Sequence, residues 1–396
     1  MMTPRPHQSE GAEWALTTIR QYGLAYLSWQ ERTGKTLTAL VAAENSSSPN
    51  ALIITKKKAV AGWLETLEEW EHCTHFDVIN YESVHKMKGD YGFIILDESH
   101  HAISGIGRKS KTWKAVRAYT KGKAILFLSA TPYAEHVGLL YHQLAQSDWS
   151  PFRKYKDFYA WYRTYGIPNM TRTPYGLQDQ RNKYKTEAVL KKVEHLFNFK
   201  TRADVGIEHE PTVNVVKIPL HDYTKKLIEG VKDDGYIKIK DVTILADSDP
   251  KTRAMHYQLE GGTIKYIDGS FYLGTNEKLD YIRNNYDISR TAVMCHFIAE
   301  RALLARELPK LRVLSSDGDA EGVDLSRYDK LVIYSMSFKT SKHTQRVARQ
   351  ANHDRATPIE VDVLVCDKPG IGLAVYEAVA LKKENFVKAS YERSIK

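Results

Sequence analysis

The chain has little cysteine, and its apolar runs are short. Its three cysteines, Cys73, Cys295 and Cys366, lie far apart, which argues against a disulfide framework or a zinc site and fits a reducing compartment. No stretch approaches the roughly 18 apolar residues that a membrane-spanning helix needs. Residues 1–6 contain no apolar segment of the kind found in signal peptides. We therefore expect a cytoplasmic protein that does not associate with a membrane.

Internal repeats and low-complexity tracts are also lacking, beyond a short run at residues 46–49. The 396 residues suffice for two or three domains, and 42% hydrophobic with 27% charged residues is the composition of a globular protein. The formal net charge of +9 favours a polyanionic partner such as nucleic acid.

A segment ending in Gly-Lys-Thr is the strongest local signal. The apolar run at 24–27 before it predicts a buried strand, and residues 37–43 after it predict a helix. A strand, a loop and a helix N-terminus in this order form a phosphate cradle, because backbone N–H groups at the helix start face the anion. The residues expected to bind a nucleotide here are Arg32, Thr33, Gly34, Lys35 and Thr36, and the hydroxyl of Thr36 can also reach Mg²⁺.

The loop departs from the full pattern, and a second element is needed to distinguish it from an ordinary loop. A further glycine is expected five residues before Gly34, where this chain has Trp29. The second element is the apolar run 93–96, which leads directly into Asp97 and Glu98. Phosphoryl transfer needs a carboxylate on the metal and a group that activates water, so we expect Asp97 to hold Mg²⁺ and Glu98 to activate water. The alternative is an acidic turn after a core strand.

A third apolar run, at 124–128, ends in Ser129, Ala130 and Thr131. Together the three segments resemble motifs I, II and III of the superfamily-two helicases and translocases. The resemblance implies ATP and Mg²⁺ as cofactors, with Lys35 on the β- and γ-phosphates. It also implies that residues 129–131 couple nucleotide binding to DNA binding.

Two segments of the first 60 residues extend the resemblance. Gln8, just upstream of the loop, resembles the glutamine that contacts adenine in this family, because its amide can donate to and accept from a purine edge. Lys56, Lys57 and Lys58 follow an apolar strand at the place of motif Ia, where they would contact a DNA phosphate. A surface glutamine and a solvated lysine cluster are the alternatives.

The C-terminal half resembles motifs V and VI. Residues expected at the nucleotide from these motifs are Gly322, Asp324, Gln345, Arg349 and Arg355. A cation facing the γ-phosphate stabilises the charge that builds up on its oxygens in the transition state. The second motif-VI arginine is replaced by Asn352, so the arginine finger is Arg349, Arg355 or both.

Alternating strands and helices predict an α/β fold with two parallel-sheet lobes in tandem, and the resemblance implies that both lobes are RecA-like. We place the first lobe at 1–145, a mainly helical insertion at 146–208, and the second lobe with a C-terminal brace helix at 209–396. The insertion interleaves aromatic and basic residues, which suits nucleic acid or a small core of its own.

The sequence therefore most resembles a small Swi/Snf-type ATPase that moves on duplex, forked or branched DNA in replication, recombination or branch migration. A monomer is expected. The alternatives are an RNA-directed ATPase of the same superfamily, a translocating subunit of a restriction or defence complex, and a DNA clamp that binds ATP without hydrolysing it.

Overall fold

The computed structural model describes residues 2–133, 135–173, 176–207, 212–267, 269–316, 325, 327–338, 360–381 and 394. The chain divides into two compact units, Met1–Gly206 and Ile207–Lys396, each with its own central sheet. Each unit is described by itself below. Within the described ranges, every helix is too short or too polar to serve as a membrane span.

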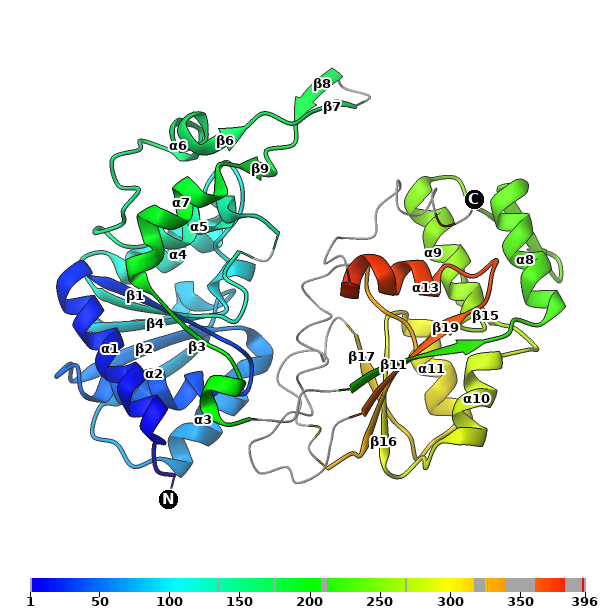
Figure 1. The fold of residues 1–396 in the computed structure, drawn as a ribbon, viewed down its shortest axis with the longest axis horizontal. Helices are drawn as coiled ribbons and strands as arrows, with labels where there is room; N and C mark the ends of the chain where they lie inside the picture. The colour runs from blue at the N-terminus through cyan, green and yellow to red at the C-terminus, as the bar shows by residue number, and fades with distance from the viewer. Residues whose placement is uncertain are drawn as a thin grey trace. The chain divides into compact units, whose positions relative to one another are not determined.

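The first unit is built on a sheet of six strands in the order β10-β1-β5-β4-β2-β3, all parallel (Figure 1). The strands are β1 (Leu24–Trp29), β2 (Asn50–Thr55), β3 (His75–Asn80), β4 (Phe93–Asp97), β5 (Ala124–Leu128) and β10 (Phe197–Lys200). Five of them coincide with apolar runs or strand signals of the sequence. Parallel strands covered on both faces are apolar throughout rather than alternating, which explains why these runs were visible.

Helices cover both faces of this sheet, because successive side chains of a strand point to opposite sides. Ala25 and Leu27 pack in one core and Leu24 and Tyr26 in the other. The first core is closed by α1 (Pro6–Tyr22), α2 (Lys35–Glu44) and α3 (Val60–Glu69). The second is closed by α4 (Lys111–Thr120), α5 (Leu140–Leu144), α6 (Phe158–Tyr165) and α7 (Thr186–Val193).

Residues 146–206 differ from the expected helical insertion in two ways. They contain the antiparallel pairs β6 (Gly166–Ile167) with β9 (Lys183–Tyr184) and β7 (Met170–Thr173) with β8 (Gly176–Asp179), besides α6 and α7. They also supply β10, which pairs with β1 and so belongs to the first sheet. The compact unit accordingly extends to Gly206 rather than ending at 145.

The aromatic residues of this segment form a core. Phe152, Phe158, Trp161 and Tyr165 are buried and pack against Tyr141 and the second face of the sheet. The neighbouring basic residues Arg153, Lys154 and Lys156 are exposed. Of the two interpretations of the interleaved pattern, the aromatic half is therefore structural, while the basic half faces solvent.

The second unit has a sheet of five parallel strands in the order β11-β19-β18-β16-β17. The strands are β11 (Thr212–Ile218), β16 (Thr291–Cys295), β17 (Arg312–Ser315), β18 (Lys330–Ile333) and β19 (Glu360–Cys366). Helices α10 (Glu277–Asn285), α11 (Ile298–Glu307) and α13 (Gly372–Tyr376) pack on it. Two parallel sheets in tandem confirm the predicted α/β class with RecA-like lobes.

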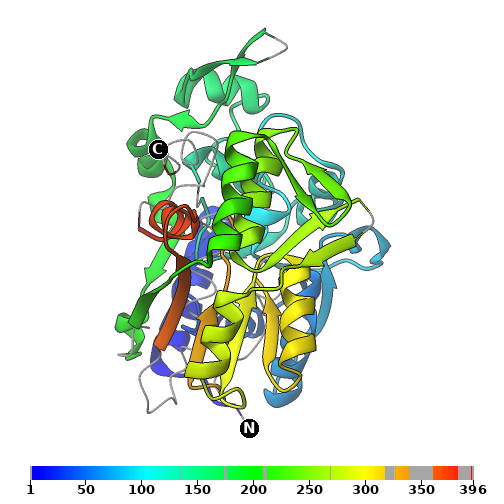
Figure 2. The ribbon, with the colours of Figure 1, turned by 90° about the vertical axis from the view of Figure 1, so that its right-hand side faces the viewer.

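A smaller layer with its own core is attached to the second sheet. Helices α8 (Asp222–Asp233) and α9 (Asp249–Glu260) pack side by side (Figure 2) against the hairpins β12 (Tyr236–Ile239)–β13 (Val242–Leu245) and β14 (Thr263–Tyr266)–β15 (Gly269–Tyr272). Buried Glu260 at the end of α9 accepts hydrogen bonds from the backbone N–H groups of Ile371 and Gly372, which ties this layer to α13. Burial raises the pKa of Glu260 to about 7.

We predict that a fragment of residues 1–206 folds, whereas a fragment of residues 1–145 does not. The shorter fragment lacks β10, so β1 becomes an unprotected edge and Tyr26 loses the stacked ring of Phe197, 4.6 Å away between centroids. Urea unfolding followed by circular dichroism should be cooperative for residues 1–206 only. Cooperative unfolding of both fragments would show that the strand is dispensable.

Candidate active site

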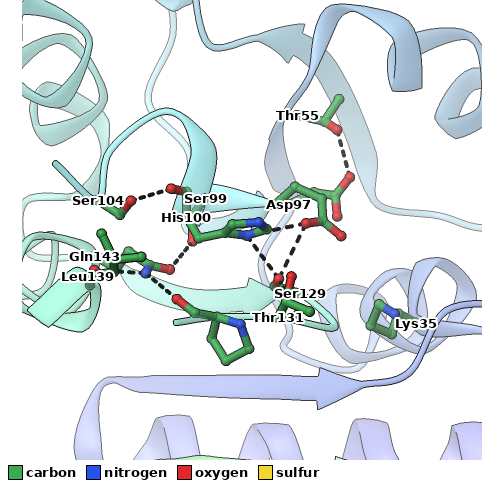
Figure 3. Close-up of polar contacts among 12 residues, drawn as sticks. Lys35, Thr55, Asp97, Ser99, His100, Ser104, Ser129, Thr131, Leu139 and Gln143 are labelled. Atoms are coloured by element: carbon green, nitrogen blue, oxygen red, sulfur yellow. Dashed lines mark hydrogen bonds and ion pairs between the residues drawn. The ribbon is translucent and has the colours of Figure 1, made fainter. Parts of the chain in front are cut away.

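The carboxyl ends of four parallel strands bring the predicted site residues to one edge of the first sheet. Strand β1 leads into the Gly-Lys-Thr loop, β2 ends at Thr55, β4 ends at Asp97, and β5 leads into Ser129. Open α/β sheets bind ligands at this edge. Figure 3 shows Lys35, Asp97, His100 and Ser129 gathered around the ends of these strands.

The loop has the backbone of a phosphate cradle. Gly34 is the N-cap of α2 with φ 88°, a left-handed conformation that favours glycine. A Cβ at Gly34 would overlap the side-chain amide of Gln8. Helix α2 starts at Lys35, so its first backbone N–H groups are available to an anion at the helix N-terminus.

The first turn of α1 braces this loop from outside. The ring of His7 is hydrogen-bonded to the carbonyl of Thr33 at 3.0 Å, and the amide of Gln8 donates to the carbonyl of Gly34 at 3.1 Å. The amide oxygen of Gln8 also accepts from the backbone N–H of Arg5 at 2.8 Å. Buried Gln8 therefore shapes the loop here, and its contact with adenine stays a prediction.

Trp29 departs from the loop pattern because it belongs to the strand. Its fully buried ring lies against Gly11 of α1, and its indole N–H donates to Asn198 of β10 at 2.6 Å. The side chain thus joins α1 to the edge strand. The ammonium of Lys35 donates to the carbonyls of Trp29 and Gln30, at 2.7 and 2.8 Å, and so lies inside the loop.

Asp97 is held by two donors that the sequence did not mark as functional. Its Oδ2 accepts from the hydroxyl of Thr55 at 2.6 Å and from the indole of Trp63 at 3.1 Å. Burial, and then the charge of Glu98, raise the pKa of Asp97 to about 6. The two hydrogen bonds and the charge of Lys35 act in the opposite direction, which places Lys35 and Asp97 in the same site.

Glu98 has a left-handed backbone, with φ 50° and ψ 38°, which is uncommon for a residue with a side chain. Its backbone N–H donates to the carbonyl of Leu128 at 2.8 Å, and its Oε2 lies 3.3 Å from the hydroxyl of Ser129 and 3.3 Å from Nδ1 of His100. The hydroxyl of Ser129 also lies 3.0 Å from Nδ1 of His100 and accepts from the backbone N–H of Thr131 at 3.0 Å.

These contacts favour one arrangement of protons. A serine hydroxyl has one hydrogen, so Ser129 donates to Glu98 when the Nδ1–H of His100 and the N–H of Thr131 donate to Ser129. Segment 129–131 is thereby attached to the carboxylate of Glu98 through buried Ser129. His100 belongs to the same segment as the acidic pair, and it is a functional candidate to which the sequence assigned no role.

The oxygen donors at this edge suit Mg²⁺. A hydroxyl at Thr36 and a carboxylate at Asp97 are the hard ligands that this ion prefers, and water and phosphate oxygens complete its usual octahedron. Glu98, His100 and His101 also offer ligand atoms within 4.8 Å of one another. That set contains two imidazoles, which suit transition metals better than Mg²⁺. We therefore keep Thr36 and Asp97 as the candidate magnesium ligands.

The remaining predicted residues divide into two groups. Lys57 and Lys58 are exposed in the turn after β2, next to half-buried Lys56, and their contact with DNA stays a prediction. The motif V and VI candidates, Gly322, Asp324, Gln345, Arg349 and Arg355, lie outside the described residues, as does Asn352.

Comparison with known families gives one match in this region. Residues 74–134, which include the acidic pair and segment 129–131, match the family described as "Type III restriction enzyme, res subunit". This match confirms the resemblance to superfamily-two helicases. No curated protein matches the chain.

Two solved structures from Sulfolobus solfataricus resemble the whole chain. The SWI2/SNF2 ATPase core in complex with dsDNA has a TM-score of 0.44 and 14% identity, over 99% of this chain and 94% of that one. The SWI2/SNF2 ATPase core domain has a TM-score of 0.43 and 14% identity, over 97% and 89%. At these scores the likeness carries no weight for function.

We predict that Gly34→Ala destabilises the first unit more than Gly122→Ala. Both glycines have a left-handed backbone, φ 88° and 68°, so each substitution costs about 1–2 kcal/mol in strain. Only at Gly34 would the added methyl group displace a neighbour, Gln8, since the space beside Gly122 is open. Denaturant unfolding of the two variants measures the difference, and equal losses would contradict the bracing role of Gln8.

We predict that in Thr55→Val the loss of Mg²⁺-dependent nucleotide binding at acid pH begins at a higher pH than in the wild type. The carboxylate of Asp97 is lost as pH falls through about 6. Removing a hydrogen bond to the charged form raises its pKa further, so binding at pH 6.5 should weaken roughly threefold. Titration with a fluorescent ATP analogue between pH 5.5 and 8 measures how the affinity for the nucleotide depends on pH. Thr66→Val, which removes an exposed hydroxyl bonded within α3, is the matched control and should leave the pH dependence of the affinity unchanged.

Proposed function

We propose that this protein is an ATP-dependent DNA translocase or helicase, with DNA-stimulated hydrolysis of ATP. The observation that carries the proposal is the convergence of Lys35, Asp97 and Glu98 at one sheet edge, with the charges of both Glu98 and Lys35 acting on the pKa of Asp97. A cationic loop beside a carboxylate pair is what phosphoryl transfer to water needs. The match of residues 74–134 to a restriction-enzyme subunit family supports the same class of chemistry.

In the proposed reaction, the α2 N-terminus and Lys35 bind the β- and γ-phosphates. Lys35 exchanges the carbonyls of Trp29 and Gln30 for phosphate oxygens. Thr36 and Asp97 would hold Mg²⁺, which when bound neutralises charge on the phosphate oxygens.

Glu98 accepts a proton from the attacking water. At the same time the water oxygen bonds to the γ-phosphorus, and the bond between the γ-phosphorus and the β–γ bridging oxygen breaks. Ser129 and His100 orient the Glu98 carboxylate for this step. Positive charge at the γ-phosphate is assigned to Arg349 and Arg355, and a neutral polar contact there to Gln345, by motif VI alone.

The nucleic-acid part of the proposal rests on charge and position. The net charge of +9 favours a polyanion, and Lys57 and Lys58 are exposed beyond the strand end next to β4. Segment 129–131 contacts Glu98 through Ser129, so a shift of this segment reaches the carboxylate directly. In the proposed cycle, DNA binding shifts segment 129–131 and thereby couples hydrolysis to movement.

A second candidate function is a translocating subunit of a restriction or defence complex. The specific observation is the family matched by residues 74–134, whose description names the res subunit of a type III restriction enzyme. Such a subunit would need a partner for full activity. A clamp that binds ATP without hydrolysing it is the third alternative, since Trp29, the last residue of β1, stands where the phosphate-loop pattern has a glycine.

The test is the rate of phosphate release with single-stranded, duplex, forked and four-way DNA, and with RNA. We expect stimulation by DNA, and a loss of roughly 100-fold or more in Glu98→Gln, since general-base catalysis contributes at least that much. Lys35→Ala should lose roughly as much, because it removes the charge that stabilises the phosphate oxygens in the transition state. Lys114→Ala, which removes an exposed lysine of α4, is the control and should match the wild type.

The same assay distinguishes the alternatives. Stimulation by RNA but not by DNA would indicate an RNA-directed ATPase, and tight ATP binding without phosphate release would indicate a clamp. Activity that appears only with a partner protein would favour the restriction or defence subunit. Turnover that is unchanged in Lys35→Ala or Glu98→Gln would refute the assignment of the site.

A further inference from the structure

A buried glutamine on α5 contacts three segments of the candidate active site. Oε1 of Gln143 accepts from the hydroxyl of Tyr26 at 2.9 Å and from that of Ser99 at 2.7 Å. Its Nε2 donates to the carbonyl of Pro132 at 2.8 Å and to that of Leu139 at 2.9 Å. Gln143 is fully buried, and Figure 3 shows it beside Ser99 and Leu139.

The partners of Gln143 allow only one orientation of its amide. The carbonyls of Pro132 and Leu139 only accept, so they require the NH₂ group. Tyr26 and Ser99 donate to the oxygen, and burial raises the pKa of Tyr26 well above its usual range, so its hydroxyl stays protonated. The four hydrogen bonds can form at the same time in only one arrangement, so the network specifies one geometry.

Three of the four partners belong to segments that carry or lead to residues of the proposed mechanism. Ser99 follows Glu98, whose left-handed backbone needs support from its neighbours. Pro132 follows Thr131, at the end of the segment that Ser129 attaches to Glu98. Tyr26 lies in β1, the strand that leads into the phosphate loop. None of these four hydrogen bonds joins Gln143 to a predicted nucleotide-binding residue.

We propose that Gln143 is a positioning residue that fixes Glu98 relative to segment 129–132 and to β1. This inference rests on the proposed ATP hydrolysis. Loss of the amide would let Ser99 and Pro132 move apart, and the carboxylate of Glu98 would move away from the line of attack. A misplacement of about 1 Å lowers the rate of a catalysed step by roughly 100-fold without a matching loss of binding.

The chain offers a matched control three residues further on. Gln146 is also fully buried, and its amide accepts from the hydroxyl of Thr120 at 2.9 Å and donates to the carbonyl of Trp113 at 3.1 Å. Both partners belong to α4, which carries none of the predicted site residues. A purely structural role of Gln143 should therefore give the same phenotype as the loss of Gln146.

The experiment compares Gln143→Met with Gln146→Met in the full chain, because methionine keeps the volume and removes the amide. We expect kcat of DNA-stimulated ATP hydrolysis to fall roughly 10- to 100-fold in Gln143→Met, with the affinity for a fluorescent ATP analogue within about threefold of wild type. Gln146→Met should keep kcat within about twofold although its melting temperature also falls. Equal kcat in the two variants at similar stability would overturn the proposal.

A second pair of variants covers failure of Gln143→Met to fold. Ser99→Ala removes one hydroxyl bonded to Gln143, and Thr120→Val removes one hydroxyl bonded to Gln146. A fall of kcat in Ser99→Ala alone, with nucleotide affinity retained, supports the proposal, and equal rates contradict it. A wild-type protein that does not hydrolyse ATP, or whose hydrolysis survives Lys35→Ala, would instead refute the proposed function and this inference with it.

Discussion

The parallel register of β1, β5 and β4 is the constraint on which the site depends. Leu128 of β5 stands opposite Leu27 on one side and opposite Asp97 on the other, so the three strands end at nearly the same level. The phosphate loop, the acidic pair and segment 129–131 therefore begin side by side. A slip of one residue in any strand would turn its side chains to the other face, and since both faces are packed, the register is strongly specified.

Within this frame the electrostatics of the edge are closely balanced. Burial and the adjacent Glu98 oppose ionisation of Asp97, while Thr55, Trp63 and Lys35 favour it, and the resulting pKa is about 6. Near neutral pH the carboxylate therefore persists without a bound cation, although a cation would stabilise it further. The hydrogen bonds to its Oδ2 also fix the direction of the group, so the ligand geometry is prepared before a cation arrives.

Sequence patterns predicted the central strands and the polar residues at their carboxyl ends, because both are determined by neighbouring residues in the chain. Central strands covered on both faces appear as apolar runs, and polar residues at their carboxyl ends mark the functional edge, which located Asp97, Glu98 and Ser129. Strand β10 was missed because it is short, lies at the edge of the sheet and leaves Phe199 largely exposed, at 59%. Thr55, Trp63 and Gln143 could not be found either, because their roles depend on hydrogen bonds to residues 34 to 117 positions away, to Asp97 in the first two cases and to Tyr26 and Ser99 in the third, which no local period encodes.

The two buried glutamines at the site share a physical reason for being amides. Gln8 links the N–H of Arg5 to the carbonyl of Gly34, and Gln143 links hydroxyl donors to the carbonyl of Pro132. Each must accept and donate at once, which an amide does without carrying charge. A carboxylate at either place would face a carbonyl unfavourably. At Gln143 a carboxylate would also place a negative charge against Ser99, the residue after Glu98, so a neutral amide preserves the geometry that the proposed hydrolysis needs.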